Sequence, residues 1–80
     1  MDEHTIQQKI DALPKIHPPR GYTVYLSDKR GVAVGIRLVR ASSQARAELT
    51  GLRVERYIYG NRKAIGAKAT LSNPIQEALS

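Results

Sequence analysis

The sequence predicts an α+β fold, a small antiparallel β-meander of four to five strands flanked by short N- and C-terminal helices. Apolar and polar residues alternate through much of residues 22–71, as they do in strands with one buried face. Turn-forming residues interrupt this alternation, and helical spacing occurs on either side of it. The 80 residues indicate a single domain. Its expected parts are an N-terminal helix (1–13), a proline-rich connector (14–21), the antiparallel sheet (22–71) and a C-terminal helix (72–80).

The first segment has the pattern of an amphipathic helix. Ile6, Ile10 and Leu13 recur at helical spacing, and two acidic residues precede them near the positive end of the helix dipole. Pro14 ends this helix, because proline lacks an amide hydrogen and pushes the preceding residue out of the helical region. More prolines follow, so we expect residues 14–21 to form an extended connector.

Residues 22–40 predict a β-hairpin around a turn at residues 28–31. Asp-Lys-Arg-Gly at the turn matches a type I turn closed by a left-handed glycine, which gives a bulged hairpin. This register predicts two apolar pairs across the hairpin, Leu26 with Val34 and Val24 with Ile36. It also predicts the facing of the rest of the second strand, with Leu38 inward and Arg37 and Val39 outward.

Residues 44–59 have the pattern of a second hairpin, with its turn at residues 50–51. In this register apolar residues face each other and acids face bases: Leu49 with Leu52, Ala47 with Val54, Glu48 with Arg53 and Arg46 with Glu55. Each such pair stabilises by roughly 0.2–1 kcal/mol, and their agreement fixes the register. A helix is the alternative, with Ser43 capping residues 44–49 and Gly51 as the C′ residue. We favour the hairpin, because that helix would span barely two turns and bury little apolar surface.

The last strand and the C-terminal segment complete the predicted fold. The glycine and asparagine within residues 59–62 suit a two-residue type II′ turn, although a longer loop would also fit. Both registers leave the same apolar residues on the buried face: Ile65, Ala67, Ala69 and Leu71. Ser72 or Asn73 would cap a final helix with Pro74 at its first position.

The chain is basic, and the excess charge lies in the predicted sheet. The formal net charge is +6 and the pI is about 10.1. Residues 21–71 carry seven more basic than acidic residues, whereas residues 1–20 are balanced. Such a balance favours a polyanionic partner. No apolar run approaches the roughly 18 residues of a membrane span, and the N-terminus has no basic, apolar signal peptide. We therefore expect a cytoplasmic protein that does not associate with membranes.

The sequence indicates neither an enzyme nor a metal or cofactor site. His4 and His17 are the only histidines and lie far apart, and the chain has no cysteine. The acidic residues show no pairing suited to acid–base catalysis. Residues 60–70 contain glycines near a lysine, but five residues rather than four separate the glycines, and an alanine precedes the lysine. We interpret this segment as a hairpin turn rather than a phosphate-binding loop.

Basic and aromatic side chains on the predicted solvent face indicate binding to nucleic acid, because cations neutralise phosphates and tyrosine rings stack on bases. Glutamates among them cancel charge at the centre of the sheet. The turns at residues 42–43 and 60–61, by contrast, would share one end without an acid. The expected nucleic-acid-binding residues are Arg37, Arg40, Arg46, Arg53, Tyr57, Tyr59, Arg62, Lys63 and Lys68.

Two function classes fit this pattern. We expect a small DNA- or RNA-binding module, such as a bacterial or phage regulator. The alternative is a protein-interaction module, an inhibitor or subunit, whose basic face binds an acidic protein. A small core and two open sheet edges, at residues 22–27 and 63–71, also predict a homodimer.

Overall fold

The computed structural model describes residues 2–72 and confirms the α+β class with an antiparallel sheet. The elements follow the chain as α1 (Glu3–Ala12), β1 (Arg20–Ser27), β2 (Ala33–Ala41), α2 (Gln44–Arg53), the π-helical turn η1 (Val54–Ile58) and β3 (Gly66–Leu71). Within residues 2–72 the sheet has three strands, so the prediction of four to five is wrong. The predicted C-terminal helix lies outside the described residues, apart from Ser72.

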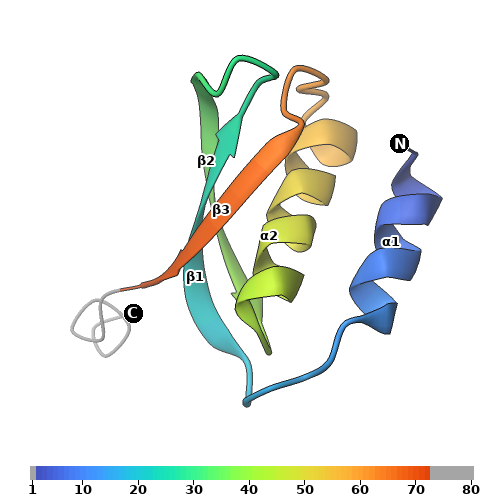
Figure 1. Cartoon of the computed structure of the whole chain (residues 1–80), viewed down its shortest axis with the longest axis vertical. Helices are drawn as coiled ribbons and strands as arrows, with labels where there is room; N and C mark the ends of the chain where they lie inside the picture. Colours follow the sequence, from blue (N-terminus) through green and yellow to red (C-terminus); the bar gives the residue numbers. More distant parts are fainter. Residues whose placement is uncertain (1, 73–80) are drawn as a thin grey trace.

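β1 is the central strand, and β2 and β3 flank it, each antiparallel to it. β2 and β3 therefore run parallel to each other, which requires a crossover rather than a hairpin between them. α2 and η1 form this crossover on one side of the sheet, and α1 packs against α2 (Figure 1). α2 thus lies between the sheet and α1, and neither helix covers the second face of the sheet.

The N-terminal helix forms as predicted. Asp2 caps it, and its carboxylate accepts a hydrogen bond from the Thr5 amide at 2.7 Å. Ile6 and Ile10 are buried on the side that faces the rest of the molecule. The helix ends at Ala12, just before the first proline of the connector.

Residues 44–53 form a helix, so the predicted central hairpin is wrong and its helical alternative is correct about the start of the helix. Ser43 caps it, since its Oγ accepts a hydrogen bond from the Arg46 amide at 3.1 Å. Gly51 does not end the helix but lies inside it, where an added Cβ would lie 2.7 Å from Cγ1 of Val24. A helical glycine costs about 1 kcal/mol relative to alanine. Here its missing side chain lets α2 approach β1 closely.

The hairpin between β1 and β2 forms around the predicted turn. Gly31 has a φ of +81°, in the left-handed region that glycine adopts without strain. The Asp28 amide donates to the Val32 carbonyl oxygen at 2.9 Å, and the Gly31 amide donates to the Asp28 carbonyl oxygen at 3.0 Å. Next to the turn, Ser27 pairs with Ala33 in the predicted register. Between Ser27 and Leu26 the register then shifts, so β2 has one extra residue in a second bulge that the sequence did not predict.

Beyond this bulge, the register of the hairpin differs from the prediction by one residue. The observed pairs are Leu26 with Gly35 and Val24 with Arg37. Because successive strand residues face opposite sides, this difference turns β2 over. The predicted inward residues Ile36 and Leu38 are exposed on the face away from α2. The predicted outward residues Arg37 and Val39 lie on the side of α2.

A buried carboxylate favours this register. Glu55, on η1, is buried against β2 and accepts a hydrogen bond from Nε of Arg37. Gly35 leaves the space that this carboxylate occupies, since a Cβ there would lie 2.8 Å from Oε1 of Glu55. The predicted register would turn Arg37 to solvent and leave a buried charge without its partner, which is costly. The Arg37–Glu55 pair therefore favours the register beyond the bulge, while the turn itself keeps its predicted form.

β3 pairs with β1, and the residues in its middle face the core as predicted. Ala69 is buried and Ala67 packs against the core, but Ile65 and Leu71, at either end, are exposed. The buried apolar residues lie mainly between the sheet and the helices: Ile6, Ile10, Tyr22, Val24, Leu26, Ala41, Ala47, Leu52, Ala64 and Ala69. Neither α1 nor α2, the α-helices in residues 2–72, is long and apolar enough to cross a membrane.

Candidate functional site

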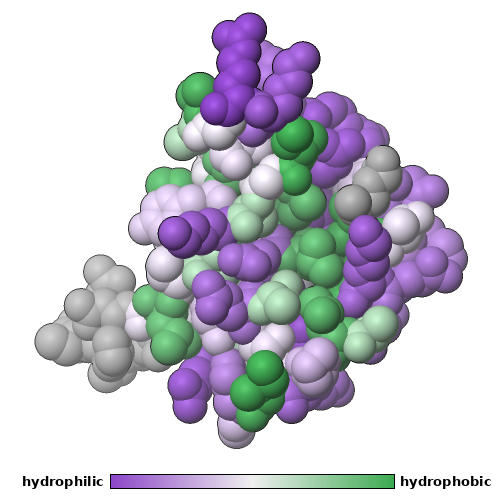
Figure 2. All heavy atoms as spheres, viewed as in Figure 1, coloured by the Kyte–Doolittle hydropathy of each residue, from purple (hydrophilic) through white to green (hydrophobic). Residues whose placement is uncertain are grey.

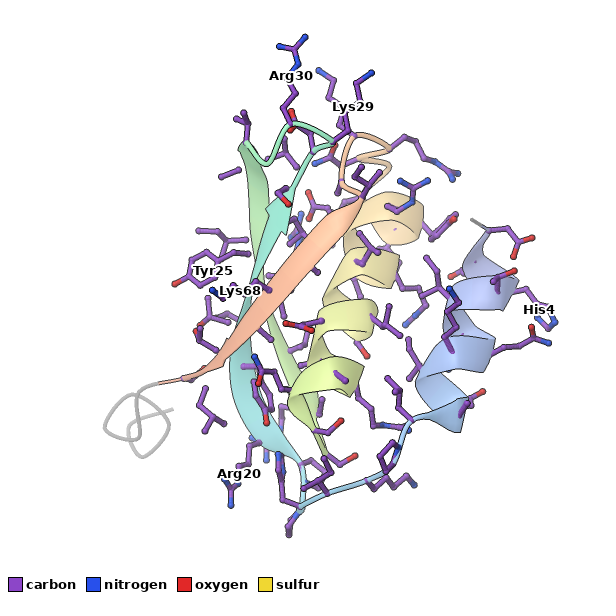
Figure 3. All side chains as sticks on the ribbon, in the orientation of Figure 1. His4, Arg20, Tyr25, Lys29, Arg30 and Lys68 are labelled. Atoms are coloured by element: carbon purple, nitrogen blue, oxygen red, sulfur yellow. The ribbon has the colours of Figure 1, made fainter. Side chains whose placement is uncertain are left out.

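Two loops at one end of the sheet bring four basic side chains together. Lys29 and Arg30 come from the β1–β2 turn, and Arg62 and Lys63 come from the loop between η1 and β3. They surround a surface depression of about 470 Å³, which Asp28 also lines. Figure 2 shows hydrophilic side chains projecting at this end of the molecule, and Figure 3 labels the two that belong to the β1–β2 turn. We call the four basic residues the basic end.

Asp28 is the acidic residue that lines this depression, and the backbone engages its carboxylate. Its Oδ1 accepts hydrogen bonds from the amides of Arg30 at 2.8 Å and Val32 at 3.0 Å. These bonds fix the turn that presents Lys29 and Arg30. They also occupy an oxygen that would otherwise be available to the cations. The lining residues retain a formal excess of three positive charges.

The loop that carries Arg62 and Lys63 is held in place by an arginine beneath it. Nη1 of Arg56 donates to the carbonyl oxygens of Arg62 at 3.1 Å and Ala64 at 2.7 Å. The guanidinium carbon of Arg62 lies 4.6 Å from the ring centroid of Tyr57, within the range of a cation–π contact. The loop therefore presents its two cations from a fixed backbone, and Tyr57 supports one of them.

Glu55 links the same loop to β2. Its carboxylate accepts hydrogen bonds from Arg37 and, at 3.0 Å, from Nδ2 of Asn61. The hydrogen bond from Arg37, followed by that from Asn61, lowers the pKa of Glu55 below its ordinary value of 4.5, and burial opposes this shift. The ring of Tyr59 also packs against Arg37, with its centroid 3.6 Å from the guanidinium carbon. Arg37 is thus engaged inside the protein, and Tyr59 lies over it.

Two further residues predicted to bind nucleic acid instead join the helices. Nη1 of Arg46 donates to the carbonyl oxygens of Ile10 at 2.7 Å and Leu13 at 2.9 Å, at the C-terminal end of α1. A cation is favourable there because the helix dipole is negative at that end. Arg53 forms an ion pair with Glu3 at 3.1 Å. Both arginines therefore connect α2 to α1.

Arg40 lies at the opposite end of the sheet from the basic end. Its Nη2 donates to the Pro19 carbonyl oxygen at 3.1 Å, and it lines a second depression of about 450 Å³ with His17 and Arg46. The prediction that the turns at residues 42–43 and 60–61 share one end, and so bring Arg40 close to Arg62, is wrong. Residues 44–58 run along the sheet once as a helical segment rather than twice as a hairpin. Backbone carbonyl groups already engage both guanidinium groups of this second depression, so it is the weaker candidate for binding an anion.

Lys29 and Arg30 are the functional candidates that the sequence did not reveal. The sequence predicts only an exposed turn there, with Asp28 beside the two cations. Their partners in the other loop come to the same end only because a helix, rather than a strand, follows β2. Lys68, a predicted contact residue, lies outside the basic end, on the exposed face of the sheet as predicted, beside Tyr25 (Figure 3).

The described residues show no arrangement suited to metal binding. Within residues 2–72, no group of three or more acidic or histidine residues is placed to hold a metal ion. His4 lies on the outer side of α1 (Figure 3). Nε2 of His17 lies 2.7 Å from the Tyr22 hydroxyl, and its Nδ1 lies 2.7 Å from the Pro18 carbonyl oxygen. Both nitrogens of the His17 ring therefore have hydrogen-bond partners within the protein.

A comparison of the chain with known protein families, curated proteins and solved structures finds no match. The geometry of the basic end is therefore the main guide to function.

Proposed function

We propose that the protein is a non-enzymatic module that binds DNA or RNA through phosphate groups at its basic end. The observation that carries this proposal is the convergence of four basic side chains, from two separate loops, around one depression. Nucleic acid presents closely spaced negative charges along its backbone, and lysine and arginine bind them with release of counterions. A cluster of cations on one surface is the electrostatic footprint of such a protein.

The exposure of these side chains supports the proposal. Lys29, Arg30, Arg62 and Lys63 are all exposed, whereas Arg37 is engaged by a buried carboxylate. Contact with phosphate at the basic end would therefore break no buried ion pair. Hydrogen bonds hold the backbone of both loops, so little backbone conformational entropy is lost when a ligand binds.

Binding to a generic duplex and to a single strand, measured across a salt series, tests the proposal. We expect the logarithm of the affinity to fall linearly with the logarithm of the salt concentration. The slope should be about −0.9 per phosphate contact for a duplex and about −0.7 for a single strand. Replacing Arg62 and Lys63 together by alanine should weaken binding to all sequences alike and reduce the slope by about two contacts.

Lys9→Ala combined with Lys15→Ala is the matched control, because it removes two exposed cations outside the basic end. Equal losses in the two double variants would mean that net charge alone drives binding, and the basic end would not be the site. The absence of binding to either probe at about 50 mM salt, where backbone contacts are strong, would exclude the proposal.

An acidic protein is the second candidate partner, and one observation favours it. Ile65 also lines the depression and is 53% exposed, so the basic end offers apolar contact area beside its charges. Protein interfaces concentrate their binding energy in a few contacts, often apolar ones, that become buried when the partner binds. For this partner, the salt dependence should be shallower than for nucleic acid, and Ile65→Ala should cost more affinity than Lys63→Ala.

A further inference from the structure

The second face of the sheet exposes apolar side chains in the part of the chain that the structure describes. Tyr25 is 46% exposed, Ile36 58% and Leu38 78%. Tyr25 and Ile36 are partners across β1 and β2, and Leu38 is the next residue on the same face of β2. Both helices lie on the opposite side of the sheet (Figure 1). We call this surface, completed by Thr23, Lys68 and Thr70, the open face.

The polar residues of the open face are uncharged or positive. Lys68 is the partner of Tyr25 across β1 and β3, and Figure 3 shows the two side chains together, directed away from the helices. Thr23 pairs with Thr70 one step further along the same strands. None of the strands β1, β2 and β3 contains an acidic residue. The open face therefore combines an aromatic ring, aliphatic side chains and a cation, with no strand carboxylate to repel an anion.

A second copy of the chain is a poor match for this face. The strands are about 4.8 Å apart and rise about 3.3 Å per residue, so the whole face measures on the order of 400 Å². A stable interface buries about 800 Å² on each partner. Face-to-face packing of two copies would also bring Lys68 near its own counterpart. Neither the area nor the charge favours such a dimer.

A single strand of nucleic acid matches the face better. Sequence-tolerant single-strand binding combines aromatic rings, on which bases stack, with cations that follow the backbone. Tyr25 supplies the ring, Ile36 and Leu38 supply apolar surface beside it, and Lys68 supplies the cation. In a duplex the bases already stack on each other, so the ring would have no base face to contact.

The open face is also continuous with the basic end. Lys29 is four residues from Tyr25, just beyond the point where β1 ends at Ser27, so their backbones are at most about 13 Å apart. A short oligonucleotide that contacts the basic end would therefore reach the open face.

We propose that the open face binds single-stranded DNA or RNA, with a base stacked on Tyr25 and a phosphate near Lys68. This inference rests on the proposed function, because the basic end supplies most of the phosphate contacts. It adds that the protein prefers a single strand to a duplex of the same sequence, and that Tyr25 is the residue responsible for this preference.

The test compares Tyr25→Leu with Tyr25→Phe, because leucine keeps apolar bulk without a ring and phenylalanine keeps the ring. Binding is measured by fluorescence anisotropy with a labelled oligothymidine of about 12 nucleotides, within the usual site sizes, and with a labelled duplex. We expect Tyr25→Leu to weaken single-strand binding by roughly 5- to 150-fold, the usual contribution of one stacked base. Duplex binding by Tyr25→Leu, and binding of both probes by Tyr25→Phe, should stay within about twofold of the parent protein. Circular dichroism checks that both variants are folded.

The outcomes separate this inference from the proposed function. If the parent protein binds both probes and Tyr25→Leu binds the single strand as tightly as the parent does, the inference is wrong and the proposed function stands. If the parent binds neither probe, both fail. Sedimentation of the parent protein and of Leu38→Asp adds an independent result. A dimer that Leu38→Asp converts to a monomer would show that a second copy occupies the open face, which also overturns the inference.

Discussion

Arg37 on β2 donates a hydrogen bond from its Nε to the buried carboxylate of Glu55 on η1. This pair joins two elements that are separated in the chain by α2. Asn61 donates to the same carboxylate at 3.0 Å and to the Val34 carbonyl oxygen at 3.1 Å, so the loop that leads to the basic end is part of the same network. The orientation of β2 and the position of that loop therefore depend on one carboxylate.

Replacing Glu55 by alanine should destabilise the fold strongly. Removing one partner of a buried pair typically costs about 3–5 kcal/mol, because the other charge is left unpaired. The Arg37 side chain is 29% exposed and can recover some hydration. We therefore expect a loss of about 2–3 kcal/mol in the free energy of unfolding, measured with urea.

The matched control for this change is Glu3→Ala, which breaks the exposed ion pair with Arg53. That substitution should cost less than about 1 kcal/mol, as exposed pairs usually do. Similar losses for Glu3 and Glu55 would mean that burial does not set the strength of the Arg37 pair.

The stability of the protein should also fall as the pH decreases, with Glu55 as one cause. Its pKa in the folded protein is lowered below the ordinary value of 4.5. The unfolded chain then binds more protons than the folded one between these two pKa values, so stability rises with pH in that window. The contribution is complete above the unfolded pKa and is lost as the pH falls through the folded pKa.

The pH prediction is checked by urea unfolding of the parent protein and of Glu55→Gln. The measurements run from neutral pH down through the folded pKa of Glu55. The glutamine variant should start less stable and should lose less stability on acidification. Asp2 contributes in the same direction, because its hydrogen bond from Thr5 lowers its pKa, so some pH dependence should remain. Parallel curves for the two proteins would contradict a role for Glu55.

Gly51→Ala should destabilise the protein even though alanine is the better helix former. The added Cβ would lie 2.7 Å from Cγ1 of Val24, inside the packed contact between α2 and β1. Overpacking of this kind costs about 1–3 kcal/mol, which outweighs the gain of about 1 kcal/mol in helix propensity.

Two further variants make the Gly51 prediction specific. In a Val24→Ala background, Gly51→Ala should cost less than it does alone, because Cγ1 and Cγ2 of Val24 are gone, although its Cβ, 2.8 Å from the added atom, remains. At the exposed helix position Ala45, the reverse change to glycine should cost about 1 kcal/mol. A stabilising Gly51→Ala would mean that α2 does not approach β1 as closely as described.

The parts of the fold that depend on neighbouring residues could be predicted from the sequence. The acidic residues at the start of the first helix, the spacing of Ile6 and Ile10, and the left-handed glycine of the 28–31 turn are all local signals. The prediction of a hairpin at residues 44–53 is wrong because the apolar and charged pairs there also fit a hairpin. The helix forms through packing against segments that are distant in the sequence. Ala47, Gly51 and Leu52 gain their burial against strands and a helix that local pairing does not contain.

In the candidate site, too, local features could be predicted from the sequence and long-range contacts could not. The sequence identified Arg62 and Lys63 correctly as members of a basic loop. It could not show that Arg37 serves a buried carboxylate, because the partner lies 18 residues away in the chain and on another element. It also could not join Lys29 and Arg30 to that loop, because their proximity follows from the return of the chain through α2.

The two loops of the basic end should act on one ligand, which leads to the last prediction. Lys29→Ala with Arg30→Ala should reduce the salt dependence of nucleic-acid binding by about as much as Arg62→Ala with Lys63→Ala. Each double variant should remove about two phosphate contacts from the slope, and the quadruple variant about four. The fold should survive, because exposed turn substitutions usually change stability by about 0.5 kcal/mol or less.

These slopes are measured by titrating the two double variants and the quadruple variant against the same duplex. Circular dichroism checks that each variant is folded. Side chains that surround one depression meet the same stretch of backbone, so the losses in slope should add. If the 29–30 variant binds with the full slope while the 62–63 variant does not, the β1–β2 turn does not contact the ligand. The binding surface would then extend from Arg62 and Lys63 toward η1 rather than across the depression.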